Sequence, residues 1–459
     1  MTQTLISDLI VVGGGGAGLT AAATAAVMAP GLSISLLEAD GGAACNTSIA
    51  SNFIPAAGTR FQRAAGIEDS PEALTADILK KNGGRGDPEL TQWICEASAD
   101  ALHWMVDALG VELELAPELT WLGHSAVRMH AHPSRGGPAV LAALKHRLSE
   151  LDQVRAFDPA RATGLIVSAC GVVTGVNAVV AGEAIRFEAP AVVLACGGFG
   201  ANPEQVARHI PEMADAPHIG AATEQGDAIA WSEALGARLA RMSAYQGRDC
   251  ISADGTRVTP PVLSQGGIAI DRTGRRFVNE LNDYSALARV YRQQPGGYAF
   301  FVWDQRIQDM VSNVFVMQQA MARRGIVRAG SLDELARSFN LPPHSLAETL
   351  AERNAPAPGT LDAFGRPTPE HPLKPPYYAA RITGAIAHTQ GGLVIDDCGR
   401  VISNEGSFIP GLYAVGNAIA GLSGDSCTGY LSGNGLLVAY TTGYVVGRHL
   451  AGQGGSLRA

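Results

Sequence analysis

Residues 8–19 read DLIVVGGGGAGL, an apolar run that leads into a glycine-rich turn. The run Asp8–Val12 is typical of a short buried strand, and Thr20–Ala26 after the turn is typical of a helix. In a dinucleotide-binding turn, three glycines allow a tight turn, close approach of a pyrophosphate, and close packing of helix on strand. Gly13, Gly15 and Gly18 have the spacing for these tasks. The stretch therefore predicts a dinucleotide site, and a glycine-rich turn without a ligand is the alternative.

A second predicted strand supports the dinucleotide site. Ser33–Leu37 is followed by Glu38, which stands about 20 residues after the last glycine. An acidic residue at this place holds the ribose hydroxyls of a bound dinucleotide. Strand, turn, helix, second strand and acid thus follow one another in the expected order.

Composition excludes several classes of protein. The chain has 459 residues, a formal net charge of −9 at pH 7 and seven scattered cysteines. The length suits two or three domains, and the negative charge predicts no nucleic-acid partner. No two cysteines stand in a CxxC pattern, which argues against a disulfide framework, a zinc site, a c-type haem and a cysteine-ligated cluster.

We also expect neither a membrane span nor a signal peptide. No apolar run reaches the about 18 residues that a membrane-spanning helix needs. The first predicted strand begins within a few residues of Met1, which leaves no room for a signal peptide. A cytoplasmic location is the resulting expectation.

The pattern along the chain changes twice. Residues 1–202 alternate helices and strands, residues 203–377 hold more charged and aromatic side chains, and residues 378–459 return to strands and glycine turns. We therefore expect an α/β fold, with a discontinuous Rossmann-like domain formed by 1–202 and 378–459 and an inserted α+β capping domain at 203–377. The expected helices are Pro71–Lys81, Pro88–Leu109, Pro138–Leu151 and Gly433–Leu450, and the expected strands include Leu165–Val167, Val172–Val180, Ala191–Ala195, Gly391–Ile395 and a segment in Gly411–Asn417.

Further segments carry a family resemblance. They are Cys45–Gln62, Gly197–Asn202, Gly274–Glu280 and Pro410–Asn417. In this order, over nearly the whole chain, they resemble the soluble fumarate reductase flavoproteins, whose superfamily also includes the 3-ketosteroid dehydrogenases. The resemblance implies FAD as the cofactor.

The resemblance also implies which residues hold FAD. The ADP half would lie on Gly13, Gly15, Gly18 and Glu38, and the pyrophosphate and isoalloxazine on Asn46, Thr47, Ser48, Ala57 and Gly58. Asp227 would lie near the flavin, Asn417 near the ribitol, and Ser432, Asn434 and Leu436 at the start of a helix that points at the pyrimidine carbonyl. A helix N-terminus stabilises the negative charge of a reduced flavin. Residues 45–51 contain no histidine, so we expect non-covalent FAD.

At two positions the chain departs from the fumarate reductases. Their Arg-Leu-Gly-Gly-Asn motif is Tyr-Leu-Ser-Gly-Asn here and begins at Tyr430, and Tyr284 replaces the arginine four residues after Glu280. A guanidinium clamps a carboxylate with two hydrogen bonds, whereas a phenol donates one hydrogen bond to a ketone oxygen. The 3-ketosteroid Δ1-dehydrogenases resemble this chain at both tyrosines and share its Asn417.

That resemblance implies a mechanism. In those enzymes one tyrosine takes the α-proton of a ketone, while the other, with a backbone N–H, polarises the carbonyl and hydride leaves the β-carbon for flavin N5. We expect Tyr284 as the base and Tyr430 with the Asn434 N–H as the donors to the oxyanion. The alternative is that each tyrosine only packs in the protein with a solvated hydroxyl.

Two further residues are candidates for substrate contacts. Arg248 stands where fumarate reductases have a substrate-binding histidine, and either binds a substrate carboxylate or forms a structural ion pair with Asp249 or another carboxylate. His388 matches the active-site histidine before the Gly-Gly turn, and either faces the substrate or flavin or is structural. A reductase would need a proton-delivering cation, for which Arg289 and Arg306 are the candidates, although surface solvation explains both.

These residues predict an FAD-dependent dehydrogenase that desaturates the Cα–Cβ bond next to a ketone. A small cyclic ketone or keto acid such as 4-oxocyclohexanecarboxylate is the expected substrate, and a steroid is the second possibility. The rival activities are a fumarate- or enoate-type reductase and a flavin-binding protein without catalysis. Without haem or cluster motifs, electrons would leave through oxygen, a quinone or dye, or a separate protein.

Overall fold

The computed structural model describes residues 3–40, 44–117, 121–252, 255 and 257–454. The chain forms two compact units. The first comprises Met1–Ile210, Gly220–Gln246 and His388–Ala459, and the second comprises Pro211–Ile219 and Gly247–Ala387. This division places residues 220–246 in the first unit, whereas the sequence pattern places them in the inserted segment.

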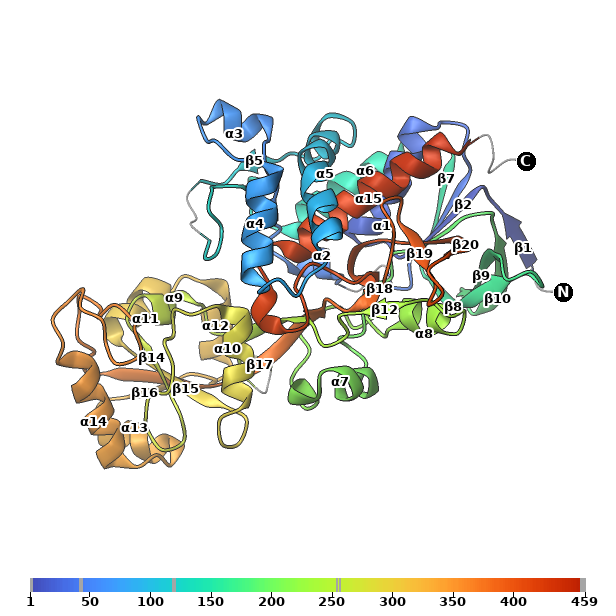
Figure 1. Cartoon of the computed structure of the whole chain (residues 1–459). Helices are drawn as coiled ribbons and strands as arrows, with labels where there is room; N and C mark the ends of the chain where they lie inside the picture. Colours follow the sequence, from blue (N-terminus) through green and yellow to red (C-terminus); the bar gives the residue numbers. More distant parts are fainter. Residues whose placement is uncertain (1–2, 41–43, 118–120, 253–254, 256, 455–459) are drawn as a thin grey trace. The chain divides into compact units, whose positions relative to one another are not determined.

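A six-stranded sheet is the centre of the first unit, with the strand order β19-β20-β11-β2-β3-β7 (Figure 1). Its strands are β2 (Leu9–Val12), β3 (Ile34–Leu37), β7 (Val154–Phe157), β11 (Val192–Leu194), β19 (Arg400–Ile402) and β20 (Phe408–Ala414). All neighbours are parallel except β19 and β20. The C-terminal strand β20 pairs directly with β11, so both ends of the chain build one sheet. The predicted α/β, Rossmann-like and discontinuous fold is confirmed.

Smaller sheets complete the strands of the first unit. One has the order β1-β10-β9-β8, another β4-β6-β5, and β12 pairs with β18. Their bounds are β1 (Gln3–Ile6), β4 (Ile54–Pro55), β5 (Glu114–Leu115), β6 (Met129–Ala131), β8 (Ala160–Val167), β9 (Val173–Val180), β10 (Glu183–Glu188), β12 (Leu239–Ala240) and β18 (Gly392–Leu393).

Five helices of the first unit, α3 to α7, begin at a side-chain cap or a proline. The hydroxyl of Ser70 accepts from the Ala73 N–H at 3.2 Å, and Pro71 opens the helix after it. The helices are α1 (Gly16–Met28), α2 (Asn46–Ile49), α3 (Arg60–Ala64), α4 (Pro71–Lys81), α5 (Pro88–Asp107), α6 (Gly137–Ser149), α7 (Pro203–His209), α8 (Asp227–Glu233) and α15 (Asn434–Gly452).

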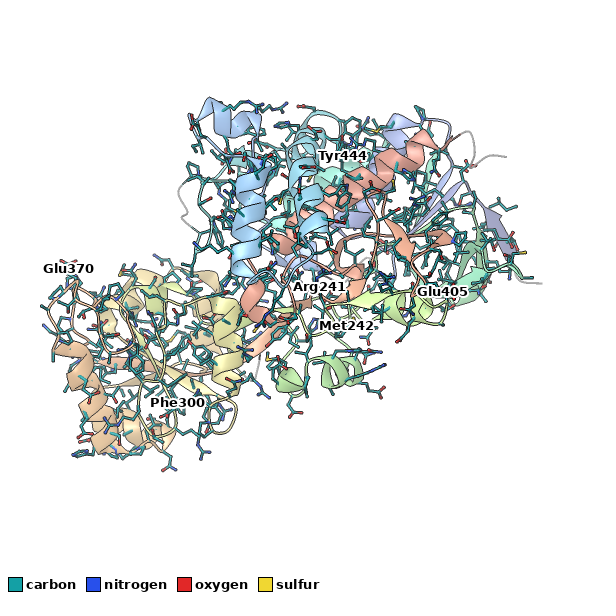
Figure 2. The ribbon with its side chains drawn as sticks, viewed as in Figure 1. Arg241, Met242, Phe300, Glu370, Glu405 and Tyr444 are labelled. Atoms are coloured by element: carbon teal, nitrogen blue, oxygen red, sulfur yellow. The ribbon has the colours of Figure 1, made fainter. Side chains whose placement is uncertain are left out.

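Small residues allow the first and last helices of this unit to pack closely. In α15, a Cβ on Gly443 or Gly447 would lie 2.6 Å from a carbonyl oxygen of α1. The two helices lie side by side (Figure 1). Tyr444, labelled in Figure 2, extends from α15 so that its ring centroid is 6.0 Å from that of Trp104 on α5. The N-terminus of α15 is thereby held in the same unit as the glycine turn before α1.

The second unit has its own sheet and its own hydrophobic core. Its strand order is β13-β17-β15-β14, and β16 also pairs with β17. The elements are β13 (Tyr245–Ile251), α9 (Pro261–Ser264), β14 (Ile268–Ile270), α10 (Tyr284–Arg292), β15 (Ala299–Asp304), α11 (Gln305–Val311), α12 (Phe315–Ala322), β16 (Val327–Ala329), α13 (Leu332–Phe339), α14 (Pro343–Asn354) and β17 (Tyr377–Thr389). Phe300 of β15, labelled in Figure 2, belongs to a buried cluster that extends from Cys250 to Ile382.

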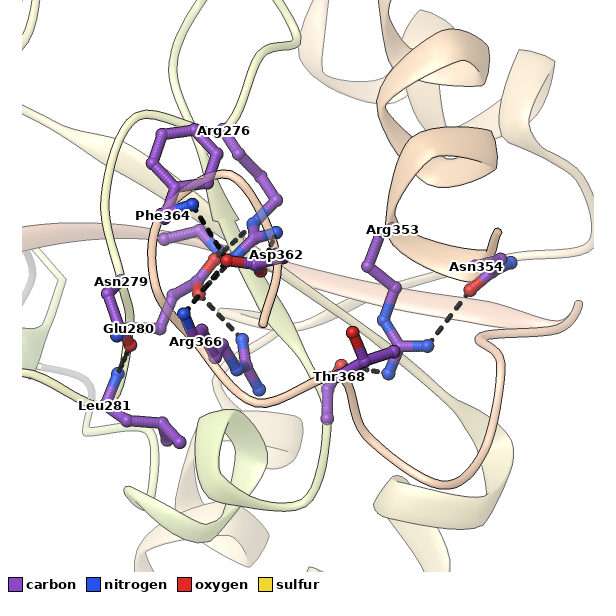
Figure 3. A network of polar contacts seen from close by, with 12 residues as sticks. Arg276, Asn279, Glu280, Leu281, Arg353, Asn354, Asp362, Phe364, Arg366 and Thr368 are labelled. Carbon is purple, nitrogen blue, oxygen red and sulfur yellow. Dashed lines mark hydrogen bonds and ion pairs between the residues drawn. The ribbon is translucent and has the colours of Figure 1, made fainter. Parts of the chain in front are cut away.

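A buried ionic network fixes the loops of the second unit (Figure 3). Glu280 accepts hydrogen bonds from Arg276 at 2.7 and 2.9 Å and from Arg366 at 2.7 Å. Arg276 also pairs with Asp362 at 2.7 Å. The side chains of Glu280 and Arg366 are at most 2% exposed. The Arg-Arg-Phe-Val-Asn-Glu run that helped to define the resemblance therefore has a structural task in this unit.

Candidate flavin site and active-site residues

The glycine turn before α1 has the shape of a phosphate-binding turn. Gly13 adopts a positive φ of 115°, and a Cβ on Gly18 would overlap the carbonyl oxygen of Gly13. A Cβ on Gly15, by contrast, would meet no atom within 4 Å. Gly15 is the N-cap of α1, and no side chain caps this helix. The turn is therefore closed on the side of the sheet and open at Gly15, where a pyrophosphate would contact the helix N-terminus.

A cavity of about 280 Å³ lies beside this turn. The Oε2 atom of Glu38 accepts from the Gly14 N–H at 2.6 Å, and its Oε1 accepts from the Asp40 N–H at 3.1 Å. These bonds hold the carboxylate at the cavity wall. The lining residues include Gly14, Glu38, Asp40, Cys45, Ser48 and Lys145. The two acids are suited to ribose hydroxyls.

The residues predicted to line the pyrophosphate lie on α2, next to α1. Thr47 Oγ1 accepts from the Gly16 N–H at 3.1 Å, and Asn46 Oδ1 accepts from the Ala221 N–H at 2.7 Å. The Ser48 hydroxyl donates to the Cys45 carbonyl at 2.8 Å. The bond between Gly16 and Thr47 fixes α2 against the first turn of α1, and the bond to Ala221 ties it to a second loop.

The remaining predicted cofactor residues lie on loops and helix starts of the same unit. Ala57 is fully buried and donates its N–H to Ser98 at 3.3 Å, and Gly58 has a φ of 72°. Asp227 opens α8 and pairs with Arg161 at 3.1 Å, and burial raises the pKa of its carboxyl. Asn417 is half-buried in the turn after β20.

The start of α15 has unmet hydrogen-bonding capacity. Asn434 is fully buried, and among the described residues neither its amide oxygen nor its amide nitrogen has a hydrogen-bond partner. Gly433 precedes it with a φ of 90°, and no side chain caps the helix. Leaving such groups unpaired is costly, which indicates a bound group with both donors and acceptors. The pyrimidine edge of a flavin has both, so these residues fit FAD.

Tyr430 lies beside this helix start. Its ring is 4% exposed, and its hydroxyl oxygen accepts from the Gly435 N–H at 3.5 Å. The His388 ring lies edge-on to it, with a centroid distance of 5.7 Å. A Cβ on Gly435 would lie 2.9 Å from His388 Cε1, so only glycine fits there. The first unit thus brings Tyr430, His388 and Gly435 together.

The backbone donor expected at Asn434 needs a correction. The Asn434 N–H donates to the Leu431 carbonyl at 3.0 Å, within the turn that leads into α15. The backbone N–H beside the Tyr430 hydroxyl is that of Gly435. Ser432 precedes it with its carbonyl bonded to His124 at 3.0 Å, and Leu436 follows in the first turn of the helix.

Tyr284 and Arg248 meet in the second unit. Tyr284 is the first residue of α10, after the N-cap Asp283, and the Arg248 guanidinium lies 4.8 Å from the centroid of its ring. The Gly247 N–H donates to Ser285 Oγ at 2.8 Å, which joins β13 to the start of α10. Backbone contacts on both sides therefore hold this pair in register.

Asp249 has a different environment from Arg248. Its carboxyl is 5% exposed and accepts from the Cys250 thiol at 3.1 Å, and burial raises its pKa to about 6. Successive residues of a strand point to opposite faces. Within the described ranges of the chain, no ion pair joins Arg248 to Asp249. The charge of Arg248 still acts on the Asp249 carboxyl, where it partly offsets the effect of burial on the pKa, but the two side chains are not in direct contact as an ion pair.

Comparison with known proteins identifies the family. The family described as "FAD binding domain" matches residues 8–436. The chain belongs to this family of FAD-binding flavoproteins.

Its relatives are reductases and a dehydrogenase. The flavoprotein is 30% identical to a fumarate reductase (cytochrome) of Shewanella frigidimarina, over 97% of this chain and 77% of the relative. It is 29% identical to a urocanate reductase of Eggerthella lenta, over 89% and 69%. A solved 3-ketosteroid-Δ4-(5α)-dehydrogenase from Rhodococcus jostii RHA1 is similar with a TM-score of 0.76 and 25% identity, over 97% of both chains. The flavoprotein is an FAD-dependent oxidoreductase that acts on CH–CH groups, as predicted.

Sequence reasoning missed two residues of this site. Gly435 directly follows the Tyr-Leu-Ser-Gly-Asn motif, and its N–H donates to the Tyr430 hydroxyl. Gln390 lies between His388 and the Gly-Gly turn, where its Nε2 is 3.3 Å from His388 Nδ1. A glutamine two residues after the histidine is the only signal for this contact. Of the two arginines considered for a reductase, Arg306 donates to the Gln265 carbonyl at 2.7 Å, and Arg289 lies on α10.

Within the described part of the chain, no helix is both long enough and apolar enough to cross a bilayer.

Proposed function

We propose that this flavoprotein desaturates the Cα–Cβ bond next to a ketone in a small cyclic ketone or keto acid, such as 4-oxocyclohexanecarboxylate. The observation that carries the proposal is the Tyr430 hydroxyl beside the Gly435 N–H at the N-terminus of α15. A phenol that is itself held by a backbone N–H is a neutral donor, which suits a ketone oxygen better than a carboxylate.

Tyr430 stabilises the oxyanion in this proposal. Removing the α-proton of a ketone places negative charge on its oxygen, so a donor aimed at that oxygen lowers the barrier. The positive end of the α15 dipole adds to its effect. The Gly435 N–H acts through Tyr430, because it donates to the hydroxyl oxygen and makes the phenol O–H a stronger donor.

Tyr284 takes the α-proton. The Arg248 guanidinium lies 4.8 Å from the Tyr284 ring centroid, so a positive charge stands beside the proposed base. When FAD is bound, it supplies the acceptor for the hydride that leaves the β-carbon. The substrate thus loses a proton and a hydride, and the electron pair of the broken α C–H bond forms the C=C bond.

Arg248 also gives a reason for a carboxylate on the substrate. Its guanidinium is half-buried, and none of the ion pairs among the described residues uses it. A guanidinium in this state binds a carboxylate with two hydrogen bonds. A keto acid therefore fits the proposal better than a steroid.

A second candidate function is reduction of a C=C bond conjugated to a carboxylate. The printed names of the relatives, a fumarate reductase and a urocanate reductase, favour it. The two tyrosines favour desaturation of a ketone over this reduction, because a reductase of a dicarboxylate needs cations at the positions where this chain has phenols.

The deciding experiment mixes the oxidised enzyme anaerobically with cyclic ketones, keto acids and a 3-ketosteroid, and follows bleaching of the flavin absorbance. We expect bleaching with a cyclic keto acid, and the product must carry a new α,β double bond. No bleaching by any ketone, together with reoxidation of the reduced enzyme by fumarate or urocanate, would refute the desaturase proposal.

The proposal also covers how FAD is attached and which acceptor takes the electrons. We propose that FAD is held without a covalent bond, so acid precipitation of the protein releases all of the flavin into the supernatant. We also propose that the reduced enzyme passes its electrons to oxygen, a quinone or dye, or a separate protein. Stopped-flow reoxidation with each of these acceptors ranks them.

A further inference from the structure

The side chain of Gln390 lies behind His388 in the first unit. Gln390 is 2% exposed, and its Nε2 is 3.3 Å from His388 Nδ1. The amide oxygen accepts from the Ser423 hydroxyl at 2.9 Å. Its backbone is tied as well, because the Gln390 N–H donates to Ala244 and its carbonyl accepts from Gly421, both at 2.8 Å. The glutamine therefore holds one place and one orientation.

The opposite edge of the His388 ring faces Tyr430 and Gly435. A Cβ built on Gly435 would lie 3.0 Å from His388 Nε2 and 3.6 Å from the Tyr430 hydroxyl. Both atoms are therefore directed at the same point beside the start of α15. His388 Nε2 is the ring nitrogen that a ligand at this point would meet.

Two groups compete for His388 Nδ1. The Thr389 carbonyl oxygen lies 3.3 Å from it and can only accept, so this contact alone would place the proton on Nδ1. The Gln390 amide nitrogen, at the same distance, can only donate and requires Nδ1 without a proton. A neutral imidazole satisfies one of the two, and the choice decides whether Nε2 is a donor or an acceptor.

We propose that Gln390 is a positioning residue that sets the tautomer of His388, so that the neutral ring carries its proton on Nε2. The bond from Ser423 to the amide oxygen turns the amide NH₂ toward Nδ1. With Nδ1 occupied as an acceptor, the Nε2–H becomes a second donor beside the Tyr430 O–H. This consequence rests on the proposed function, since an oxyanion at that point makes use of both donors.

Nitrogen NMR of the FAD-loaded enzyme with ¹⁵N-labelled histidine tests the tautomer directly. The His388 signals are assigned by their loss in His388→Gln. We expect an unprotonated Nδ1 and a protonated Nε2 in the wild-type enzyme. In Gln390→Leu the Thr389 carbonyl still lies 3.3 Å from Nδ1, so the proton should move to Nδ1. In Gln390→Glu the carboxylate can only accept, so Nδ1 should again be protonated.

Two internal controls are available in the same unit. His124 Nε2 lies 3.0 Å from the Ser432 carbonyl, which fixes its proton on Nε2, and burial lowers its pKa to about 4. Its signals should be the same in every variant. Gln153, which donates to the Ala26 carbonyl at 2.9 Å, provides a matched glutamine, and Gln153→Leu should leave the His388 tautomer unchanged.

The kinetic expectation follows from the tautomer. Gln390→Leu and Gln390→Glu should each slow flavin reduction by the ketone roughly 10-fold, with unchanged FAD affinity, because one donor is lost while the flavin contacts remain. A wild-type Nδ1 that carries the proton, or a tautomer that does not respond to Gln390→Leu, would overturn the inference. If no ketone reduces the flavin while the NMR result is as expected, the desaturase proposal fails and the assignment of the tautomer stands.

Discussion

Tyr430 is the residue that best distinguishes a ketone substrate from a carboxylate substrate. Its hydroxyl accepts from the Gly435 N–H, and its ring meets His388 edge-on. If it donates to an oxyanion, Tyr430→Phe should reduce the rate of flavin bleaching by the ketone roughly 100-fold, with FAD affinity preserved. Stopped-flow absorbance measures the rate. Tyr378→Phe is the control, because it removes a hydroxyl that donates to Gln305 at 2.7 Å within the second unit, and it should have little effect. If Tyr430→Phe changes the rate of flavin bleaching by less than about twofold, Tyr430 only packs in the protein.

Substitution of Asn434 should weaken FAD binding and at the same time stabilise the apoprotein. Its buried amide lacks partners, so Asn434→Leu removes an unsatisfied group and should stabilise the apoprotein by about 1–3 kcal/mol. The same change removes contacts to the flavin, so FAD affinity should fall at least about 10-fold, which corresponds to about 1.4 kcal/mol. Thermal melts of the apoprotein and fluorescence titration with FAD measure the two effects. Asn404→Ala, at an exposed position, is the control. Unchanged FAD affinity would show that the amide does not contact the cofactor.

The buried carboxyl of Asp249 should make the folding stability of the protein depend on pH. Burial raises the pKa of its carboxyl to about 6, above its ordinary value near 4. A raised pKa in the folded protein means that the favourable contribution is complete below about pH 4 and is lost as the pH rises through about 6. The loss amounts to about 3 kcal/mol. Asp249→Asn keeps an acceptor for the Cys250 thiol but carries no charge, so it should be the more stable protein at pH 8 and differ little at pH 4. Denaturant titrations at both values measure this, and a variant that is less stable at pH 8 would contradict the prediction.

At the scale of elements, the sequence predicts helices better than short strands. Pro71–Lys81 agrees with α4 because Ser70, Pro71 and the two lysines mark both ends. The strand expected at Gly391–Ile395 is reduced to β18, Gly392–Leu393, because these residues pair only with the two residues of β12. Tertiary pairing decides such lengths, and local patterns do not contain it.

The candidate site, like the strands, could be predicted from the sequence only in part. Motif spacing predicted Tyr430 and the start of α15, since both lie close together in sequence. The Asn434 N–H that was expected to be a donor is used by the turn at Leu431, and the N–H beside the Tyr430 hydroxyl is that of Gly435. The partnership of Gln390 with Ser423 joins positions 33 residues apart and has no motif.

The turn before α1 offers a test that separates folding from cofactor binding. A Cβ on Gly18 would overlap the Gly13 carbonyl, so Gly18→Ala should destabilise or unfold the first unit. A Cβ on Gly15 meets no protein atom, so Gly15→Ala should fold normally but bind FAD at least about 10-fold more weakly, a loss of about 1.4 kcal/mol, because the methyl group blocks the approach of the pyrophosphate. Circular dichroism and FAD titration distinguish the two. Normal FAD affinity in Gly15→Ala would place the pyrophosphate elsewhere.

At the scale of the whole molecule, each unit has its own hydrophobic core. The buried cluster of the second unit runs from Cys250 to Ile382, and those of the first unit draw on residues 9–237 and 393–450. The change in composition near residue 203 does not reveal that α8 belongs to the first unit. Its Asp227 pairs with Arg161 of β8, a contact between residues far apart in sequence. Separate cores lead us to expect separate unfolding transitions.

Glu280 tests that expectation, because its network lies wholly within the second unit (Figure 3). Glu280→Gln leaves the buried guanidinium groups of Arg276 and Arg366 without their shared carboxylate, which should cost about 3–5 kcal/mol. Glu348→Gln is the matched control, since Glu348 pairs with Arg275 at the surface, with both side chains 42% exposed, and such pairs contribute about 0–1 kcal/mol. In calorimetry, Glu280→Gln should lower one transition, while added FAD raises the other, because FAD stabilises only the unit that binds it. A single transition that responds to both FAD and Glu280→Gln would mean that the two cores unfold together.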